Sequence, residues 1–121
     1  MEIKTGYFAY AKKYEELGYK CISIARSTPK WFRGIRLTQL APTYDTLNRY
    51  KGGLLDEERY KDEYLAYLSS VDVQGVLRPF KDDKIILLCY EKSDSFCHRH
   101  LLAKYLGNKF GLDVKELEIV K

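Results

Sequence analysis

The segment 84–90 is the feature that most constrains how this chain folds. Four consecutive aliphatic residues, Ile85 to Leu88, run without polar alternation and are followed by Cys89 and Tyr90. A strand with one face in water alternates apolar and polar side chains, so this unbroken run predicts a strand that is buried on both faces. Such strands are typical of parallel sheets with helices packed on both sides.

Shorter segments predict the other elements. The pattern indicates further strands over 3–9, 19–25 and 114–120, and helices over 10–17, 37–50, 57–69, 74–80 and from Asp94 or Ser95 to Gly107. Gly18 and the pair Gly52-Gly53 are expected to end helices, and Asp56 to cap one. This order predicts an α/β fold: a single three-layer domain over 1–121, with a small, mostly parallel central sheet flanked by helices.

Composition excludes several classes of protein. With 45% hydrophobic and 31% charged residues, the chain is neither disordered nor a membrane protein. Its longest apolar run, 85–90, is far shorter than the roughly 20 residues that span a bilayer. Met1 is followed at once by Glu2 and Lys4, so no secretion signal is expected. The three cysteines are an odd number, which argues against a disulfide framework and favours the reducing cytoplasm, the host cytoplasm if the protein is viral.

The charge pattern predicts a mild attraction for anions. There are 21 Lys and Arg against 17 Asp and Glu, a net charge of +4, and both signs are mixed along most of the chain. The most basic window is 30–49, which argues for anions in general rather than for duplex DNA. A base-stacking role for Trp31 or Tyr44 in this window is an open alternative. The window's charged residues are Lys30, Arg33, Arg36, Asp45 and Arg49.

The spacing of potential metal ligands does not match a zinc signature, because paired CxxC or HxxxH motifs are missing. The one local cluster is Cys97, His98 and His100. Adjacent residues on a helix point about 100° apart, so Cys97 and His98 are not expected to share an ion. The sequence therefore predicts no metal site, and nothing in it calls for a cofactor.

The candidate ligand site lies beyond the carboxyl ends of the predicted strands, where parallel sheets bind ligands. Three loops fall there: 9–10, 26–28 and 91–98. The third leads into the first turn of a helix, whose free backbone N–H groups favour an anion. Arginine side chains add donors suited to phosphate. The predicted ligand-binding residues are Arg26, Ser27, Thr28 and Arg99.

Three residues in and after the third loop are candidates for catalysis. A thiol in the first turn of a helix has a lowered pKa, which makes Cys97 a candidate nucleophile. His98 is suited to move protons near neutral pH, and Glu91 is the nearby carboxylate. Other interpretations stay open: Cys97 also fits an apolar helix row that packs into the core, and Glu91 fits an ion pair with Arg26 across neighbouring strand ends. Cys89 is interpreted as buried filler.

Two segments of the chain are similar to a known family. The sequence C-I-S-I-A-R-S-T-P over 21–29 resembles the D/S-x-x-R-x-x-P element of the domain-of-unknown-function family 488 (DUF488). The sequence L-L-C-Y-E over 87–91, followed by C-H-R over 97–99, resembles that family's most specific signature, LLCxE…CHR. The opening Thr5-Gly6-Tyr7 matches the family's T-x-G strand less closely, since many members carry Gly-His there. The likeness covers nearly the whole chain, and the segment 40–64 resembles compact members from bacteriophages and bacteria.

The resemblance implies a polar cluster rather than a reaction, because the family has no settled activity to carry over. Ser23 stands where many members have Asp, which leaves Glu91 as a single carboxylate and argues against schemes that need two acids. By this likeness the cluster consists of Arg26, Cys89, Glu91, Cys97, His98 and Arg99.

The leading functional hypothesis is a small enzyme that acts on a phosphorylated or nucleotide-like ligand at the carboxyl ends of the strands. The expected partner is therefore a phosphate-bearing small molecule or nucleotide, with no membrane involved and the oligomeric state left open. The alternative is a non-catalytic module, of phage origin, that binds a nucleotide or a partner protein. A factor that binds nucleic acid through the basic window 30–49 ranks third.

Overall fold

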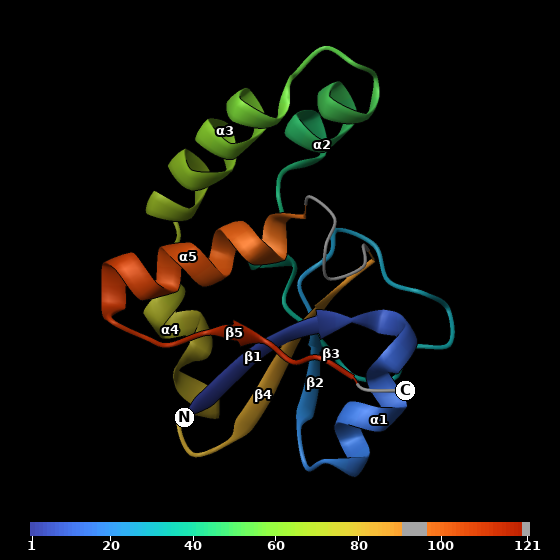
Figure 1. Ribbon diagram of the computed structural model, residues 1–121. Helices are drawn as coiled ribbons and strands as arrows, with labels where there is room; N and C mark the ends of the chain where they lie inside the picture. The colour runs from blue at the N-terminus through green and yellow to red at the C-terminus, as the bar shows by residue number, and fades with distance from the viewer. Residues whose placement is uncertain (91–96, 120–121) are drawn as a thin grey trace.

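Strand β4 (Lys84–Cys89) lies at the centre of the sheet, as its unbroken apolar run predicts (Figure 1). The computed structural model describes residues 1–90 and 97–119 of the chain, and in this strand five of the six residues are buried. Strand β1 (Glu2–Tyr7) pairs with one edge of β4 and β2 (Lys20–Ser23) with the other, both in parallel. The short strands β3 (Ile35–Arg36) and β5 (Lys115–Glu116) complete the all-parallel order β3-β2-β4-β1-β5.

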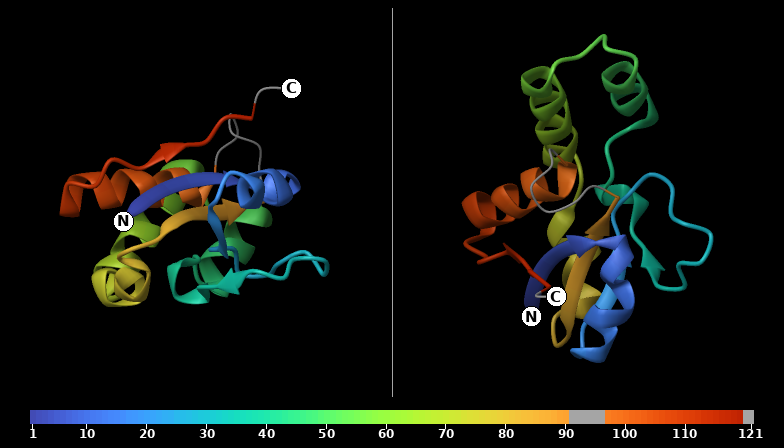
Figure 2. Two further views of the ribbon diagram at one scale, coloured as in Figure 1. Left: turned by 90° about the horizontal axis from the view of Figure 1, so that it is seen from below. Right: turned by 45° about the vertical axis from the view of Figure 1, so that its right-hand side comes forward.

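Helices cover both faces of the sheet (Figure 2). Helix α1 (Ala11–Glu16) packs on one face, over a core that includes Ile86 and Leu88. Helices α3 (Glu57–Ser69), α4 (Val73–Leu77) and α5 (His98–Phe110) pack on the other, over a core that includes Ile85 and Leu87. Alternate residues of β4 thus feed the two cores, and the prediction of a layered α/β domain is confirmed.

Helices α2 (Tyr44–Lys51) and α3 pack against each other beyond the carboxyl ends of the strands (Figure 1). Asp56 caps α3 as predicted, because its Oδ1 accepts a hydrogen bond of 2.8 Å from the backbone N–H of Arg59. The helix buries Tyr60, Tyr64 and Leu68, which are spaced four residues apart and so share one face. The longest helices of the described ranges have 13 residues, and none is suited to cross a bilayer.

The predicted helix over 37–50 is wrong as a single element. A turn of 3₁₀ helix over Thr38–Leu40 is separated from α2 by Pro42. Proline has no N–H to donate and disfavours the helical conformation in the residue before it; Ala41 is accordingly extended, with φ −85° and ψ 154°. Thr43 then caps α2 by accepting a hydrogen bond from Thr46 N.

Other boundaries also differ from the prediction. The proposed caps Asp94 and Ser95 lie outside the described residues; helix α5 begins at His98, after Cys97, and continues past Gly107 to Phe110. Gly111 ends it in the left-handed conformation, with φ 68°, which glycine adopts without strain. Strand β5 pairs over two residues only, since β1 is its single neighbour among the described strands. Strand β3 and the 3₁₀ turn over Arg78–Phe80 at the end of α4 were not predicted separately.

Candidate functional site

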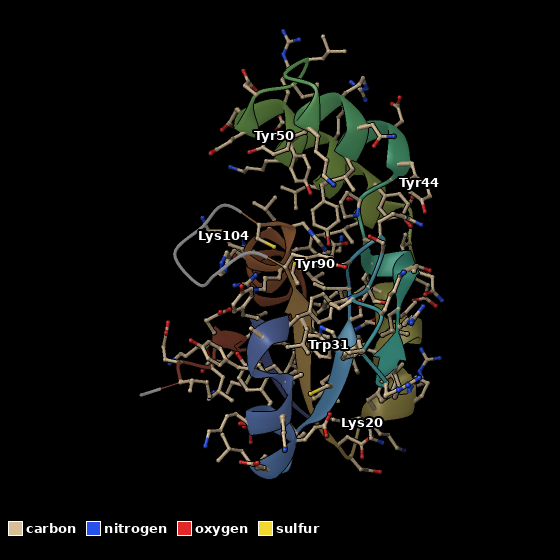
Figure 3. The ribbon with its side chains drawn as sticks, turned by 90° about the vertical axis from the view of Figure 1, so that its right-hand side faces the viewer. Lys20, Trp31, Tyr44, Tyr50, Tyr90 and Lys104 are labelled. Carbon is tan, nitrogen blue, oxygen red and sulfur yellow. The ribbon has the colours of Figure 1, made fainter. Side chains whose placement is uncertain are left out.

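A pocket of about 150 Å³ opens at the carboxyl edge of the sheet, between the ends of β2 and β4 and the helices α2 and α3. A cavity of this size holds a single ring or a phosphate group rather than a whole nucleotide. Figure 3 shows the side of the molecule on which Tyr50 and Tyr90, two of its lining residues, are found. Its lining consists of Ala25, Arg26, Ser27, Pro42, Leu47, Tyr50, Lys51, Tyr60, Cys89, Tyr90, Cys97 and His98.

His98 is held in one orientation and one tautomer. It is the first residue of α5, is 7% exposed, and places Nε2 2.6 Å from the backbone oxygen of Ile24, at the end of β2. A carbonyl oxygen only accepts, so Nε2 carries the hydrogen and the neutral ring keeps a lone pair on Nδ1. The edge of the Tyr64 ring packs against the imidazole, with centroids 5.6 Å apart. His98 therefore presents a basic nitrogen in a fixed position.

Two thiols face that nitrogen. Nδ1 of His98 lies 3.6 Å from Sγ of Cys89 and 3.9 Å from Sγ of Cys97. The Cys97 thiol donates to Sγ of Cys89, 2.6 Å away. Both cysteines are buried by neighbouring protein but line the pocket. Cys89, interpreted from the sequence as filler, is thus part of the site, because the last residue of β4 meets the first turn of α5.

The predicted lowering of the Cys97 pKa is wrong. Cys97 precedes the helix in extended backbone, φ −156° and ψ 145°, and is 4% exposed. Burial raises the pKa of its thiol well above the usual range, and the hydrogen bond it donates to Cys89 raises it further. The nearby His98 lowers it by less. Cys97 is therefore a neutral thiol at physiological pH.

Arg26 points its guanidinium across the pocket mouth toward α2. Its Nε and Nη2 donate to the backbone oxygen of Pro42, at 3.1 and 3.0 Å, and its guanidinium lies 5.1 Å from the centre of the Tyr44 ring. These contacts orient the cation without neutralising it, since a carbonyl and an aromatic ring carry no net charge. With Lys51, it gives the pocket lining two positive charges. Among the described residues, no acidic side chain lines this pocket.

Arg99 does not line the pocket, contrary to its predicted role beside Arg26. Its side chain is fully buried and forms a bidentate ion pair with Glu116 of β5, both N···O distances being 3.1 Å. Burial is the largest single effect and lowers the pKa of Arg99, but the hydrogen bonds to Glu116 and the charge interactions around the guanidinium together outweigh it, so the pKa is raised. Thr5 donates to the same carboxylate at 2.6 Å. The arginine of the C-H-R motif thus ties α5 to β1 and β5.

The neighbouring glycine of the opening strand has a packing role as well. A Cβ at Gly6 would lie 2.7 Å from the ring of Tyr14, which is closer than side chains approach. The Tyr14 hydroxyl accepts a hydrogen bond of 3.1 Å from the backbone N–H of Tyr7. Glycine at this position therefore allows α1 to lie against β1.

The remaining predicted residues divide into three cases. Ser27 lines the pocket. Thr28 is half-buried one residue further on and is not part of the lining. Glu91 lies outside the described residues, so both its catalytic role and its ion pair with Arg26 stay predictions. Sequence reasoning missed Lys51, Tyr50 and Tyr60, because only the fold of α2 and α3 carries them to the strand ends.

The cluster of Cys89, Cys97 and His98 also holds the donor atoms of a metal site, all within 4.8 Å of one another. The prediction that Cys97 and His98 do not share an ion assumed that both lie on one helix. In the structure Cys97 lies before the helix, and Cys89 lies close to both residues. Two thiolates on one tetrahedral zinc ion stand about 3.8 Å apart, from two Zn–S bonds of about 2.3 Å. The two sulfur atoms are 2.6 Å apart in this structure, so they would have to separate to hold one zinc ion together.

A protein-family model described as the active DUF488-N3 subclade matches residues 10–109. The chain belongs to the DUF488 family. No curated protein and no solved structure gives a significant match. The matched range contains all residues that line the pocket and also the C-H-R motif over 97–99, and the resemblance stated from these residues is confirmed.

Proposed function

We propose that this DUF488 member is a small enzyme that acts on a phosphorylated or nucleotide-like ligand, with Cys89 as the nucleophile. The observation that carries the proposal is the basic Nδ1 of His98, 3.6 Å from Sγ of Cys89, in a pocket that also presents Arg26. Covalent catalysis needs a nucleophile, a base within reach and donors that hold the electrophile. The description of the matching subclade as active also favours catalysis.

Cys89 is a better nucleophile than Cys97 for two reasons. It lies closer to Nδ1 of His98, and it accepts the hydrogen bond that the Cys97 thiol donates. A donated hydrogen bond and an adjacent imidazolium both stabilise negative charge on sulfur. Cys97 then stays protonated and supports the thiolate at Cys89. Cys97, the candidate nucleophile of the sequence analysis, thus has the role of a hydrogen-bond donor in this proposal.

The reaction consists of two displacements at phosphorus. His98 Nδ1 takes the proton of Cys89, Sγ attacks, the S–P bond forms, the bond from phosphorus to the leaving oxygen breaks, and that oxygen takes the proton from the imidazolium. Water then attacks phosphorus while His98 accepts its proton, the S–P bond breaks, and phosphate leaves. The proton on His98 returns to the Cys89 thiolate. Arg26 donates to the phosphoryl oxygens in both steps.

A non-catalytic binding module is the second candidate function. The observation that favours it is the burial of both thiols, since burial opposes formation of a thiolate and raises the pKa of Cys97. In that case the cluster would be a structural part of the pocket, and Arg26 and Lys51 would hold an anion that leaves unchanged.

The test is a set of single cysteine variants of the full chain. Phosphate release is measured with aryl phosphate and a panel of nucleoside phosphates, and acid-quenched samples are weighed by mass spectrometry for a phosphorylated chain. We expect Cys89→Ser to lose roughly 10³-fold or more of kcat, and Cys97→Ser roughly 10- to 100-fold. The matched control is Cys21→Ser, a buried cysteine outside the pocket, which keeps wild-type kcat.

One outcome would contradict the nucleophile and another would contradict the enzyme. Full turnover in Cys89→Ser would exclude this residue as the nucleophile. An absence of turnover together with a ligand-dependent rise in melting temperature, lost in Arg26→Ala, would favour the binding module; ligand at about 100 times its Kd adds about 2.7 kcal/mol to the stability.

A further inference from the structure

The loop that leaves the pocket after β2 is basic, and no acidic side chain of residues 1–90 or 97–119 neutralises it. Residues 26–44 contain four cations and no acidic residue. Lys30, Arg33 and Arg36 are exposed, and none of them forms an ion pair with a described residue. By contrast, Arg49 is held by Asp45 and Glu63. The free positive charge of the window 30–49 therefore gathers on the loop 30–36.

Exposed aromatic rings border the pocket on the same side of the molecule. Figure 3 shows Trp31, Tyr44, Tyr50 and Tyr90 together on this side. Trp31 is 57% and Tyr44 62% exposed, although both are large apolar rings. Rings left in water beside free cations are the two parts of a surface that binds unpaired bases by stacking and phosphates by charge.

Trp31 and Tyr44 are each connected to the pocket through side-chain contacts. Tyr90, which lines the pocket, packs edge-on against Phe8 with centroids 5.1 Å apart, and Phe8 packs against Trp31 at 6.5 Å. On the other side, the guanidinium of Arg26 lies between the pocket and the Tyr44 ring, 5.1 Å from its centre. A ligand that fills the pocket and extends either way meets one of the two exposed rings.

We propose that the ligand of this pocket is a single-stranded nucleic acid, which stacks bases on Trp31 and Tyr44 and places one phosphate on Arg26. This inference rests on the proposed function, because it names the substrate class of the same site. The pocket of about 150 Å³ takes one group of the strand, and the surrounding surface takes the rest. A duplex is excluded from the stacking contacts, since its bases already stack on one another.

The test measures fluorescence anisotropy of a labelled oligonucleotide of about 16 nucleotides, the upper site size of small single-strand modules, and of the same sequence as a duplex. We expect the single strand to bind more tightly, with a log–log salt slope near −2.8 from four phosphate contacts. Trp31→Ala and Tyr44→Ala should each weaken binding roughly 5- to 100-fold, the range measured for lost base stacking.

The charge control compares two double variants that have the same net charge. Arg33→Glu with Arg36→Glu should weaken binding and flatten the salt slope by about 1.4, whereas Lys104→Glu with Lys109→Glu, two exposed residues of α5, should leave both unchanged. Neither Lys104 nor Lys109 lines the pocket that holds Arg26. Melting temperatures of all variants are measured first, so that a lost fold is not taken for lost binding.

The outcomes separate this proposal from the enzyme. Equal affinity for duplex and single strand, wild-type binding by Trp31→Ala and Tyr44→Ala, or an equal effect of the two charge pairs would overturn the nucleic-acid surface while leaving Cys89 chemistry on small phosphates intact. If Cys89→Ser still binds the strand but keeps full turnover of small phosphates, the nucleophile is wrong and the surface stands.

Discussion

His98 and Arg99 are adjacent in the sequence, and both are buried polar residues, yet their surroundings differ in kind. His98 fixes one nitrogen on a backbone oxygen and leaves the other facing two thiols in a pocket. Arg99, one helix position further on, faces β5 instead and donates from Nε and Nη2 to the carboxylate of Glu116. A helix rotates about 100° per residue, which is enough to send neighbours to different environments.

The difference teaches how to separate function from structure among buried polar groups. A buried charge that is held in an ion pair away from any pocket stabilises one arrangement of the chain. A buried polar group that directs a lone pair into a pocket is instead a candidate for binding or catalysis. The predictions below remove one or the other kind of contact and measure the stability of the fold, the reactivity of the thiols, or both.

The largest effect on stability is expected for Arg99→Leu. It leaves the Glu116 carboxylate, 15% exposed, facing a leucine, and the loss of one partner of a buried ion pair costs about 3–5 kcal/mol. Urea unfolding measures this loss. Arg99→Leu combined with Glu116→Leu should recover most of it, apart from the Thr5 hydrogen bond. Arg49→Leu, which removes an arginine from a far more exposed ion pair, is the matched control and should cost much less.

His98→Gln should show the reverse pattern. A glutamine can still donate to the Ile24 oxygen but provides no base of comparable strength for the thiols. The rate of Cys89 alkylation by iodoacetamide at neutral pH should fall roughly 10²-fold, the lower range for loss of a general base. The unfolding free energy should fall by only about 1–2 kcal/mol. A large stability loss with unchanged alkylation would place His98 with Arg99 among the structural groups.

The sequence was sufficient for the parts of the fold that depend on local pattern. The apolar run Ile85 to Leu88 predicted the central strand, and Asp56 with the i, i+4 spacing of the following tyrosines predicted α3 closely. It failed at 37–50, where the apolar spacing continues through Pro42 and suggests one helix. There Pro42 disfavours the helical conformation at Ala41, and the spacing of apolar residues carries no information about this restriction.

The candidate site was predicted in place but not in detail. The rule for parallel sheets directed attention to the strand ends, and Arg26, Ser27, Cys97 and His98 do line the pocket found there. Whether a thiol at a helix start is activated depends on its burial, which spacing alone does not reveal. Nor does spacing show which way Arg99 points, because its partner Glu116 is 17 residues away on an edge strand.

A smaller effect is expected for Arg26→Gln, a cation that lines the pocket. Iodoacetate and iodoacetamide differ by one negative charge, so the ratio of their rates at Cys89 reports the attraction of the pocket for anions. We expect that ratio to fall roughly tenfold, as for loss of a charged hydrogen bond. Lys20→Gln removes a cation at the far end of the sheet and should leave the ratio unchanged (Figure 3). Equal ratios in both variants would contradict an anion site at Arg26.

The smallest effect at neutral pH concerns Cys21, a thiol that is buried like Cys89 but sealed in the core under α1, where it donates to the Ala11 oxygen. Burial raises the pKa of Cys21 from an ordinary 9.0 to about 11. The folded state therefore holds its proton where the unfolded chain loses it, and the stability it contributes is complete below pH 9 and declines as the pH rises through about 11. Between these limits the wild type should lose about 2 kcal/mol more than Cys21→Ala in urea unfolding, since each unit of pKa difference is worth about 1.4 kcal/mol. Cys21 should also resist iodoacetamide at pH 8, since only about 10⁻³ of it is thiolate there, whereas Cys89 reacts. Equal alkylation rates of Cys21 and Cys89 would contradict the claim that access through the pocket makes Cys89 the more reactive thiol.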